Sequence, residues 1–224
     1  MSAKIKVTGQ GGNAFPSCSV RTDKMKQSLS GILQSAISVK KWMEKSPSVD
    51  LVRPAKCPRC DHAAREPGRP LGLHGHGTRF RQLRGPPAVG RPSEEIEIEL
   101  RRYRCQSCGA AMTVGPAGLL TQRLFTAMAI GLALALWSGG RSHAAVRGEV
   151  SAWSIVGAAA HARWNSLRRW ARAAGRGRLW PHIKVSTEWT PREIAKRVTA
   201  ILMSRGPPDE CAKARVFAGA AHIA

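Results

Sequence analysis

The sequence predicts an α+β protein in which a small four-cysteine β-ribbon is followed by a mainly α-helical region. Two Cys-x-x-Cys pairs enclose a stretch of strictly alternating residues, the pattern of a half-buried strand. Beyond the second pair, apolar residues recur at helical spacing after residues that favour helix N-termini. At 224 residues, the chain can hold one or two small domains. Its composition divides it into an N-terminal extension (1–50), the ribbon (51–116), a helix-turn-helix region (117–187) and a C-terminal helical tail (188–224).

The N-terminal extension is predicted to be partly disordered, with one short helix. Residues 4–19 show no hydrophobic period and are rich in glycine. The apolar residues that follow at helical spacing are Leu29, Ile32, Leu33, Ala36 and Ile37. We expect this helix to end near Lys45, because Pro47 would stop it.

The two cysteine pairs, Cys57 with Cys60 and Cys105 with Cys108, predict a metal site. Each pair can place two thiolates on one ion, and together they supply the four sulfur ligands of a tetrahedral site. Such a ligand set favours zinc, so we expect Zn²⁺ as a structural cofactor. The alternative is a pair of redox or disulfide-forming sites, but neither pair lies in the βαβ pattern in which redox motifs of this spacing are found.

Three histidines lie near the cysteines in sequence: His62, His74 and His76. Four cysteines already complete a tetrahedral site, so we expect these histidines on the ribbon surface, with phosphate contact by His74 and His76 as the alternative. Cys18 and Cys211 have no nearby partner and are expected to be reduced thiols. Because the sequence shows no signal peptide, the expected compartment is the reducing cytoplasm.

The residues between the cysteine pairs predict a β-hairpin. Glu95–Leu100 alternates acidic and apolar residues and leads into Cys105. Its predicted partner is Leu71–Leu83, and the proline- and glycine-rich Gly85–Ser93 is the predicted loop. This pairing would set two arginines opposite glutamates, each cross-strand pair contributing roughly 0.2–1 kcal/mol. The residues concerned are Arg79 and Arg81 on one strand and Glu95, Glu97 and Glu99 on the other.

The chain is strongly basic, with 36 Lys and Arg against 14 Asp and Glu, a net charge of +22 and a pI near 11.2. This excess is larger than solubility requires, which indicates a polyanionic partner. Nucleic acid is the commonest such partner, because each neutralised phosphate releases counterions. The alternative is a compositional excess of solvated arginine that serves no partner.

The apolar stretch Leu124–Trp137 raises the question of a membrane span. Its 14 residues fall short of the roughly 20 needed to cross a bilayer, so we expect a buried helix and no membrane partner. Ser142 is expected to cap a short helix over His143–Val150. A third helix over Ala162–Ala174 would complete a helix-turn-helix region.

The predicted helix Ala162–Ala174 separates core residues from polar ones. Its apolar stripe consists of Trp164, Leu167, Ala171 and Ala174. The candidate DNA-binding residues lie off this stripe: Asn165, Arg168, Arg169, Arg172 and, just past the helix, Arg176. Arg and Asn make bidentate contacts to base edges in the major groove, which admits a helix. Between residues 118 and 187, ten basic residues accompany the single acid Glu149, so salt bridges cannot satisfy them. A surface helix with solvated arginines is the alternative.

The remaining aromatic and C-terminal residues are expected to pack. Packing between helices is predicted for Trp153, Trp170 and Trp180, with stacking on an unpaired base as the alternative. Thr190–Glu193 has the form of a capping box with proline at the first helical position, and Gly206 with two prolines would end that helix. Asp209 is expected to cap a final helix through Ala221, whose apolar content suits packing or self-association.

The order of these motifs resembles that of a known family. CPRC, LHGHGTRFRQLRG and IEIELRRYRCQSCGAAMTVGPAGLL, followed by an apolar helix and WNSLRRWARAAGRG, are similar to the zinc-ribbon and helix-turn-helix leader region of bacterial insertion-sequence transposases and related mobile-element proteins. The resemblance covers about residues 51–180, and the Arg-Arg-Tyr-Arg-Cys run is its most distinctive part. It implies that the ribbon and helices bind element-end duplex DNA. It also assigns metal to Cys57, Cys60, Cys105 and Cys108.

The chain departs from that family in its acidic residues. A transposase of this kind cuts DNA with two metal ions held by a carboxylate triad. The acids after Cys108 are Glu149, Glu188, Glu193, Asp209 and Glu210, and no aspartate lies on a strand-like segment. We therefore expect a non-catalytic, nucleoid-associated DNA-binding protein. The alternatives are an RNA-binding or ribosome-associated zinc protein and a catalytic transposase or nuclease with a divergent site.

Overall fold

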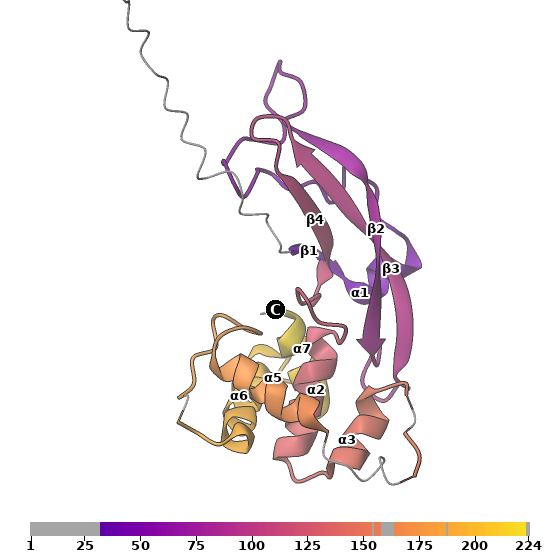
Figure 1. Ribbon diagram of the computed structural model, residues 1–224, viewed down its shortest axis with the longest axis vertical. Helices are drawn as coiled ribbons and strands as arrows, with labels where there is room; N and C mark the ends of the chain where they lie inside the picture. Colours follow the sequence, from indigo (N-terminus) through magenta and orange to yellow (C-terminus); the bar gives the residue numbers. More distant parts are fainter. Residues whose placement is uncertain (1–31, 154, 158–163, 187, 223–224) are drawn as a thin grey trace, which may run out of the picture.

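The computed structural model of the chain describes residues 32–153, 155–157, 164–186 and 188–222 (Figure 1). A four-stranded sheet forms one end of the molecule and a group of helices forms the other. The described helices follow the strands in sequence, except for the short α1 (Val39–Glu44). The chain is therefore an α+β protein, as predicted.

The sheet has the strand order β1-β4-β3-β2. Its long strands β2 (Leu73–Gly85) and β3 (Glu94–Cys105) form the predicted antiparallel hairpin. β4 (Ala111–Ala117) pairs antiparallel with β3, and β1 (Ile32–Ser38) pairs parallel with β4. The hairpin is thus confirmed, whereas the sequence patterns predict neither β4 nor β1.

The register of the hairpin differs from the predicted one. Arg79 and Arg81 lie opposite apolar residues of β3, so neither faces a glutamate. The pair that forms is Arg84 with Glu95, whose guanidinium and carboxylate groups are 3.3 Å apart. Burial of apolar side chains determines this register. Leu83 and the apolar side chains of β3 share the sheet face that packs on the helices, and a one-residue slip would turn the β3 side chains away from them.

The prediction of a helix that ends near Lys45 is wrong for most of the segment concerned. Ile32–Ser38 forms β1 instead, and only α1 is helical; Leu29 lies outside the described residues. Leu33 and Ile37 pack beside the cysteines with the two-residue period of a strand. Because pairing with β4 satisfies the backbone of this segment, a long-range contact overrides its helical spacing.

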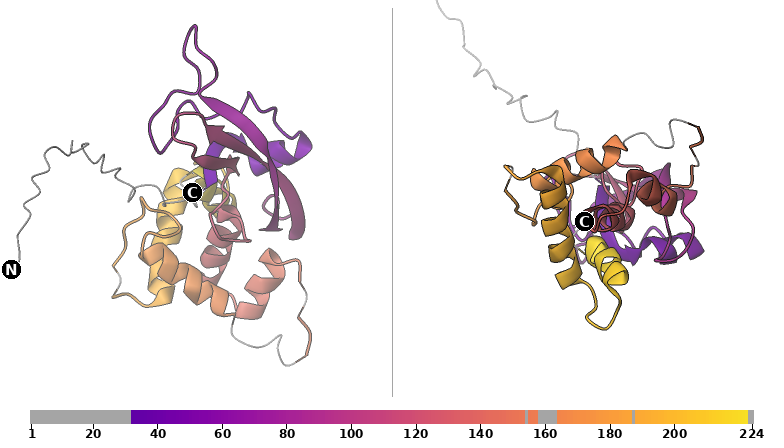
Figure 2. Two further views of the ribbon diagram at one scale, coloured as in Figure 1. Left: turned by 45° about the horizontal axis from the view of Figure 1, so that its top comes forward. Right: turned by 90° about the horizontal axis from the view of Figure 1, so that it is seen from below.

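Five further helices are described: α2 (Ala127–Ser138), α3 (His143–Val150), α5 (Asn165–Gly175), α6 (Pro191–Arg205) and α7 (Ala212–His222). α2 lies at their centre, and nearly all of its side chains are buried because α3, α5, α6 and α7 pack around it. Figure 2 shows α6 and α7 side by side. Within the described residues, each helix is too short or too polar to cross a bilayer.

Most of the predicted helix ends are confirmed. Ser142 accepts a hydrogen bond from the backbone of α3 and begins it, and the Thr190 capping box with Glu193 begins α6. Gly206 ends α6. The predicted Asp209 cap is wrong, because residues 206–211 form the turn that reverses the chain, and α7 starts only after it, at Ala212.

Two apolar cores meet at the sheet. The larger one contains Leu83 and Leu100 from the sheet and the buried side chains of the five helices α2, α3, α5, α6 and α7. The smaller one lies on the cysteine side and contains Trp42, Leu73 and Tyr103. The sheet therefore joins two cores.

The tryptophans only partly follow their prediction. Trp170 and Trp180 are buried in the larger core, as expected. Trp153 is 58% exposed. Its ring centre lies 4.4 Å from the Arg84 guanidinium, and its indole N–H donates a hydrogen bond of 2.7 Å to Glu95. Trp153 therefore joins the chain after α3 to the β2–β3 hairpin.

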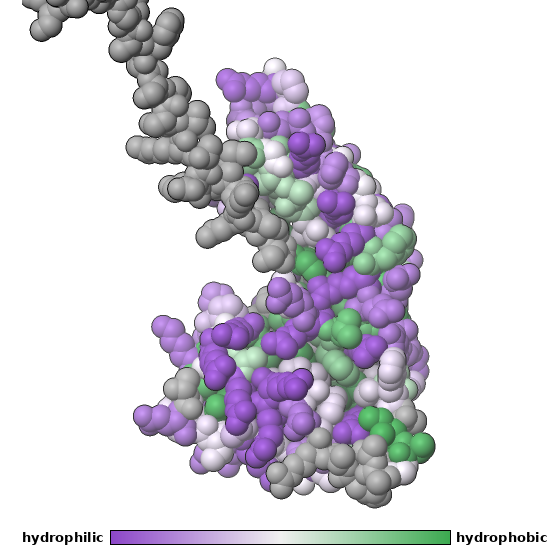
Figure 3. Space-filling model, viewed as in Figure 1, coloured by the Kyte–Doolittle hydropathy of each residue, from purple (hydrophilic) through white to green (hydrophobic). Residues whose placement is uncertain are grey.

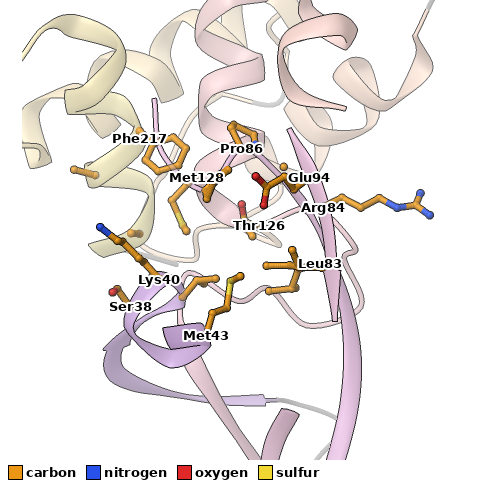
Figure 4. A pocket seen from close by; sticks show the side chains of 16 residues that line it. Ser38, Lys40, Met43, Leu83, Arg84, Pro86, Glu94, Thr126, Met128 and Phe217 are labelled. Atoms are coloured by element: carbon orange, nitrogen blue, oxygen red, sulfur yellow. The ribbon is translucent and has the colours of Figure 1, made fainter. Parts of the chain in front are cut away.

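A pocket of about 150 Å³ lies where α1 and the hairpin meet α2 and α7. Figure 4 shows that Met43, Leu83, Met128 and Phe217 line it. The lining side chains are mainly apolar and come from both halves of the molecule, so this pocket is a gap in the junction between sheet and helices.

Two helical glycines, one of them at the crossing of α6 and α7, predict opposite effects of substitution by alanine. A Cβ at Gly219 of α7 would collide with the Leu202 carbonyl of α6. We expect Gly219→Ala to destabilise the protein by about 2 kcal/mol or more, because backbone rather than a flexible side chain has to move. Gly148 of α3 has open space around its Cβ position, so Gly148→Ala should stabilise by up to about 1 kcal/mol. Urea denaturation measures both, and equal midpoints would contradict this packing.

Candidate metal centre and basic helix

The two cysteine pairs sit in turns with the same backbone hydrogen bonds. In the first turn, the Cys57 N–H donates to the His62 carbonyl (2.8 Å) and the Asp61 N–H to the Cys57 carbonyl (2.8 Å). In the second, the Cys105 N–H donates to the Ala110 carbonyl (2.9 Å) and the Gly109 N–H to the Cys105 carbonyl (3.0 Å). The two turns are thus equivalent, and each presents both of its sulfurs to the same side.

A left-handed residue follows the second cysteine of each turn. Asp61 has φ of 56° and Gly109 has φ of 69°. Glycine adopts this conformation without strain, and aspartate is among the few other residues that tolerate it. The second turn is also bonded to the residue that precedes β2, because the Gln106 N–H donates a hydrogen bond of 2.9 Å to the Gly72 carbonyl.

The four sulfurs lie close enough together for a tetrahedral metal site. The Sγ atoms of Cys57 and Cys108 are 3.7 Å apart, as are those of Cys60 and Cys105, and all four lie within 4.8 Å of one another. In a tetrahedral site with Zn–S bonds of about 2.3 Å, neighbouring sulfurs lie about 3.8 Å apart. A disulfide would require about 2.05 Å. The predicted ligands therefore come together as a possible metal site, and the cysteines are not disulfide-bonded.

The local environment changes the acidity of these thiols in opposite directions. Burial raises the pKa of Cys57, and it raises the pKa of Cys108 to about 12. A hydrogen bond from the His62 backbone is the main cause that lowers the pKa of Cys60 to about 7. Thiolates at the buried positions consequently need a nearby positive charge, which a bound dication supplies.

The neighbouring histidines are not ligands in this arrangement. Among the described residues, the cluster of metal-ligating side chains consists of the four cysteines alone. His74 and His76 are exposed on β2, and the ring of His62 lies against Gly72, where a larger residue would collide with it. Cys211 is exposed and lies apart from the cluster; Cys18 is outside the described residues.

Long-range hydrogen bonds of Arg53 and Tyr103, which the sequence patterns do not predict, hold the chain around the cysteine cluster. Arg53 donates to the Leu73 carbonyl at the start of β2 and pairs with Asp50 at 2.6 Å. The Tyr103 hydroxyl donates a hydrogen bond of 2.6 Å to the Val49 carbonyl. These contacts bind the segment before the first cysteine pair to the hairpin. They join residues about 20 and 54 positions apart, so no local spacing reveals them.

α5 presents the predicted DNA-binding residues on one exposed face. At about 100° per residue, Asn165, Arg168, Arg169 and Arg172 fall within an arc of about 100°. All four are exposed, as is Arg176 at the C-cap. The opposite side of α5 is buried against α2 and α6. Figure 3 shows hydrophilic side chains gathered over this part of the molecule.

These arginines have no carboxylate partners in the part of the chain that the structure describes. The salt bridges found there involve other basic residues, chiefly near the cysteine turns, in the hairpin and around Glu149. The basic face of α5 is therefore uncompensated.

The connection before α5 is longer than the turn of a helix-turn-helix motif. α3 ends at Val150 and α5 begins at Asn165, whereas that motif joins its two helices through three or four residues. α5 packs against α2 and α6, and Val146 and Val150 of α3 belong to the same core. The helix-turn-helix assignment stays a prediction.

No family model, curated protein or solved structure matches this chain.

We predict that the purified chain carries one metal ion at the four cysteines and that Cys57→Ser and Cys105→Ser each release it. Loss of a ligand should unfold the smaller core, because metal binding and folding are coupled in such sites. Metal analysis measures the stoichiometry. Tyr103 is the chain's one tyrosine and is buried in that core, so its fluorotyrosine NMR signal reports the local unfolding.

Cys211→Ser is the matched control, since that thiol lies outside the cluster. It should leave both the metal content and the tyrosine signal unchanged. A chain purified without chelator that is folded around Tyr103 yet free of metal would refute the site.

Proposed function

We propose that this chain is a non-catalytic, zinc-containing protein of mobile-element origin, similar to transposases, that binds duplex DNA through α5. The observation that supports DNA binding best is the set of polar side chains on the exposed face of α5, which lack carboxylate partners in the described residues. These residues are Asn165, Arg168, Arg169, Arg172 and Arg176.

The chemistry of this face suits DNA. An α-helix fits the major groove, where Arg pairs with guanine and Asn with adenine through two hydrogen bonds. The net charge of +22 favours association with a polyanion and makes the affinity dependent on salt. Burial of Leu167, Trp170 and Ala171 holds the helix in place, so its arginines need not order a flexible segment on binding.

The four-cysteine centre fits a structural zinc ion. Four thiolates fill a tetrahedral coordination shell and leave no open position for a water or substrate. The ion would hold the two cysteine turns together where β2 begins and β3 ends. Zinc is accordingly assigned to the fold of the ribbon and not to a reaction.

The positions of the acidic residues support a non-catalytic role. Glu149 accepts a hydrogen bond from Lys213 (2.8 Å) and lies 3.9 Å from Arg141, and Glu193 belongs to the α6 capping box. A two-metal nuclease needs carboxylates that converge on a pair of ions. Within the described residues, the acids do not form such a group.

We predict that replacing Arg168, Arg169 and Arg172 with alanine weakens duplex binding. If all three contact phosphates, the slope of log affinity against log salt should fall by about 2.7; a base contact would instead cost roughly 1–3 kcal/mol at one position of the site. Fluorescence anisotropy over a salt series, with DNA and RNA duplexes of the same sequence, measures both quantities.

Replacing Lys40, Lys41 and Lys45 with alanine is the charge-matched control, because these exposed lysines lie on and next to α1, remote from α5 in the sequence. This variant should keep the salt slope of the parent protein. Tighter binding to RNA than to DNA would favour the RNA-binding alternative. If the arginine variant binds the duplex as tightly as the parent protein, and removal of zinc abolishes this binding, the ribbon would be identified as the DNA-binding element.

We also predict that the chain does not cut DNA. A supercoiled plasmid incubated with Mg²⁺ or Mn²⁺ should stay supercoiled, because the acids of the described residues do not converge on a site for two metal ions. Gel electrophoresis follows the plasmid. Nicking that disappears in Glu149→Gln would show a divergent active site.

A further inference from the structure

The two faces of the sheet are covered to different extents. Alternate residues of β3 point to the same face, so Ile98 and Leu100 pack toward the helices and Arg102 and Arg104 continue along that face. Arg79 and Arg81 of β2 are paired with Leu100 and Ile98 and therefore lie on this face too. The helices cover only its apolar end, which leaves a basic area beside the junction.

A pocket of about 380 Å³ lies in this area, between the sheet and the loop that precedes α2. Its polar lining comes from three separate parts of the chain: Arg79 and Arg81 of β2, Thr113 of β4, and Thr121, Gln122 and Arg123 of the loop. All six side chains can donate hydrogen bonds, and none is acidic. A lining of this kind is suited to an anion.

Arg81 is held at this pocket without an acidic partner. Its Nη2 group donates to the carbonyls of Leu120 (2.6 Å) and Arg123, and the described residues offer no carboxylate to any of the three arginines. The pKa of Arg81 is lowered, mainly because the side chain is partly buried and to a smaller extent because the charge of Arg79 is nearby. The pocket therefore concentrates positive charge that its own residues do not neutralise.

The loop is held in place before any ligand binds. The Arg84 N–H donates to the Leu124 carbonyl (2.8 Å), and the Thr126 N–H donates to the Arg84 carbonyl (3.1 Å). The Ile32 N–H of β1 donates to the Thr121 hydroxyl (3.3 Å). Because both edges of the sheet hold this loop, the pocket is preorganised.

The same loop also contacts α5. Phe125 packs edge-to-face on Trp170, with ring centres 5.0 Å apart, and on Trp164, at 6.0 Å. Trp164 directly precedes α5, and Phe125 is two residues from Arg123. Figure 1 shows this loop between the sheet and α5. The loop that lines the pocket is thus packed against the N-terminal half of the basic helix.

We propose that the pocket formed by Arg79, Arg81 and Arg123 binds a phosphodiester group of the DNA that α5 holds, an inference that rests on the proposed function. Its ligand is the phosphate group of a nucleic-acid backbone. Contacts to phosphate carry no sequence information, but they set the position of a protein on the duplex. The pocket would therefore position α5 in the groove.

Arg79→Gln with Arg123→Gln tests this proposal without removing Arg81, which ties the loop to β2. In duplex binding over a salt series, the double variant should lose about 0.9 from the salt slope, because the two arginines would contact the same phosphate. The control is Arg65→Gln with Arg69→Gln, two exposed arginines near the cysteine turns, which should keep the parent slope. NMR signals of the arginine Nε–H groups show which side chains the duplex contacts.

The possible outcomes distinguish failure of the pocket proposal from failure of the proposed DNA binding by α5. If the α5 variant loses duplex binding while the pocket variant keeps the salt slope of the parent protein, the pocket proposal is overturned and the proposed DNA binding stands. Absence of duplex binding by the parent protein overturns the proposed function. Titration with inorganic phosphate distinguishes the two sources of the anion: signals of Arg79 and Arg123 that respond to free phosphate but not to the duplex would also overturn the proposal.

Discussion

Strand β3 is the element on which the rest of the structure depends, because its two faces belong to two different cores. Ile98 and Leu100 are buried against the helices, whereas Tyr103 and Cys105 are buried on the metal side. A one-residue slip of β3 would exchange these faces, turning Ile98 and Leu100 away from the helices and Cys105 away from the other cysteines. The register of one strand therefore determines both where the cysteines meet and how the helical half attaches.

Charge is distributed unevenly over this frame. Asp50 pairs with two arginines near the cysteine turns, and Glu95 pairs with Arg84 in the hairpin. Among the described residues, the salt bridges include none of the basic residues of α5 or of the pocket near Arg81. Concentrated like charge opposes folding, since it is self-repulsive. The basic surface is consequently a feature that packing alone does not account for, and a bound polyanion would offset its cost.

Local patterns were sufficient wherever the determining contacts are close in sequence. The paired cysteines, the alternating Glu95–Leu100 segment, the Ser142 cap and the Thr190 capping box each depend on residues within a few positions. β1 and the hairpin register depend on distant partners: Ile32 pairs with Thr113, and the alignment of Arg79 follows from burial against helices that come later in the chain. For that reason the sequence alone could not show the pocket, although the two-residue spacing of Arg79 and Arg81 indicates that they share one face of a strand.

The structure also indicates how the metal centre and the basic helix can be related. The cysteine turns belong to the smaller core and α5 to the larger one, so no buried side chain is shared between them. The connection between them runs along β2, which begins opposite Cys105 and reaches the loop before α2, where Arg81 and Arg84 bond to it. A structural ion at the cysteines would act on the basic surface through the position of this strand. Strand β2 is therefore the element that links the cysteine end of the sheet to the loop beside α5.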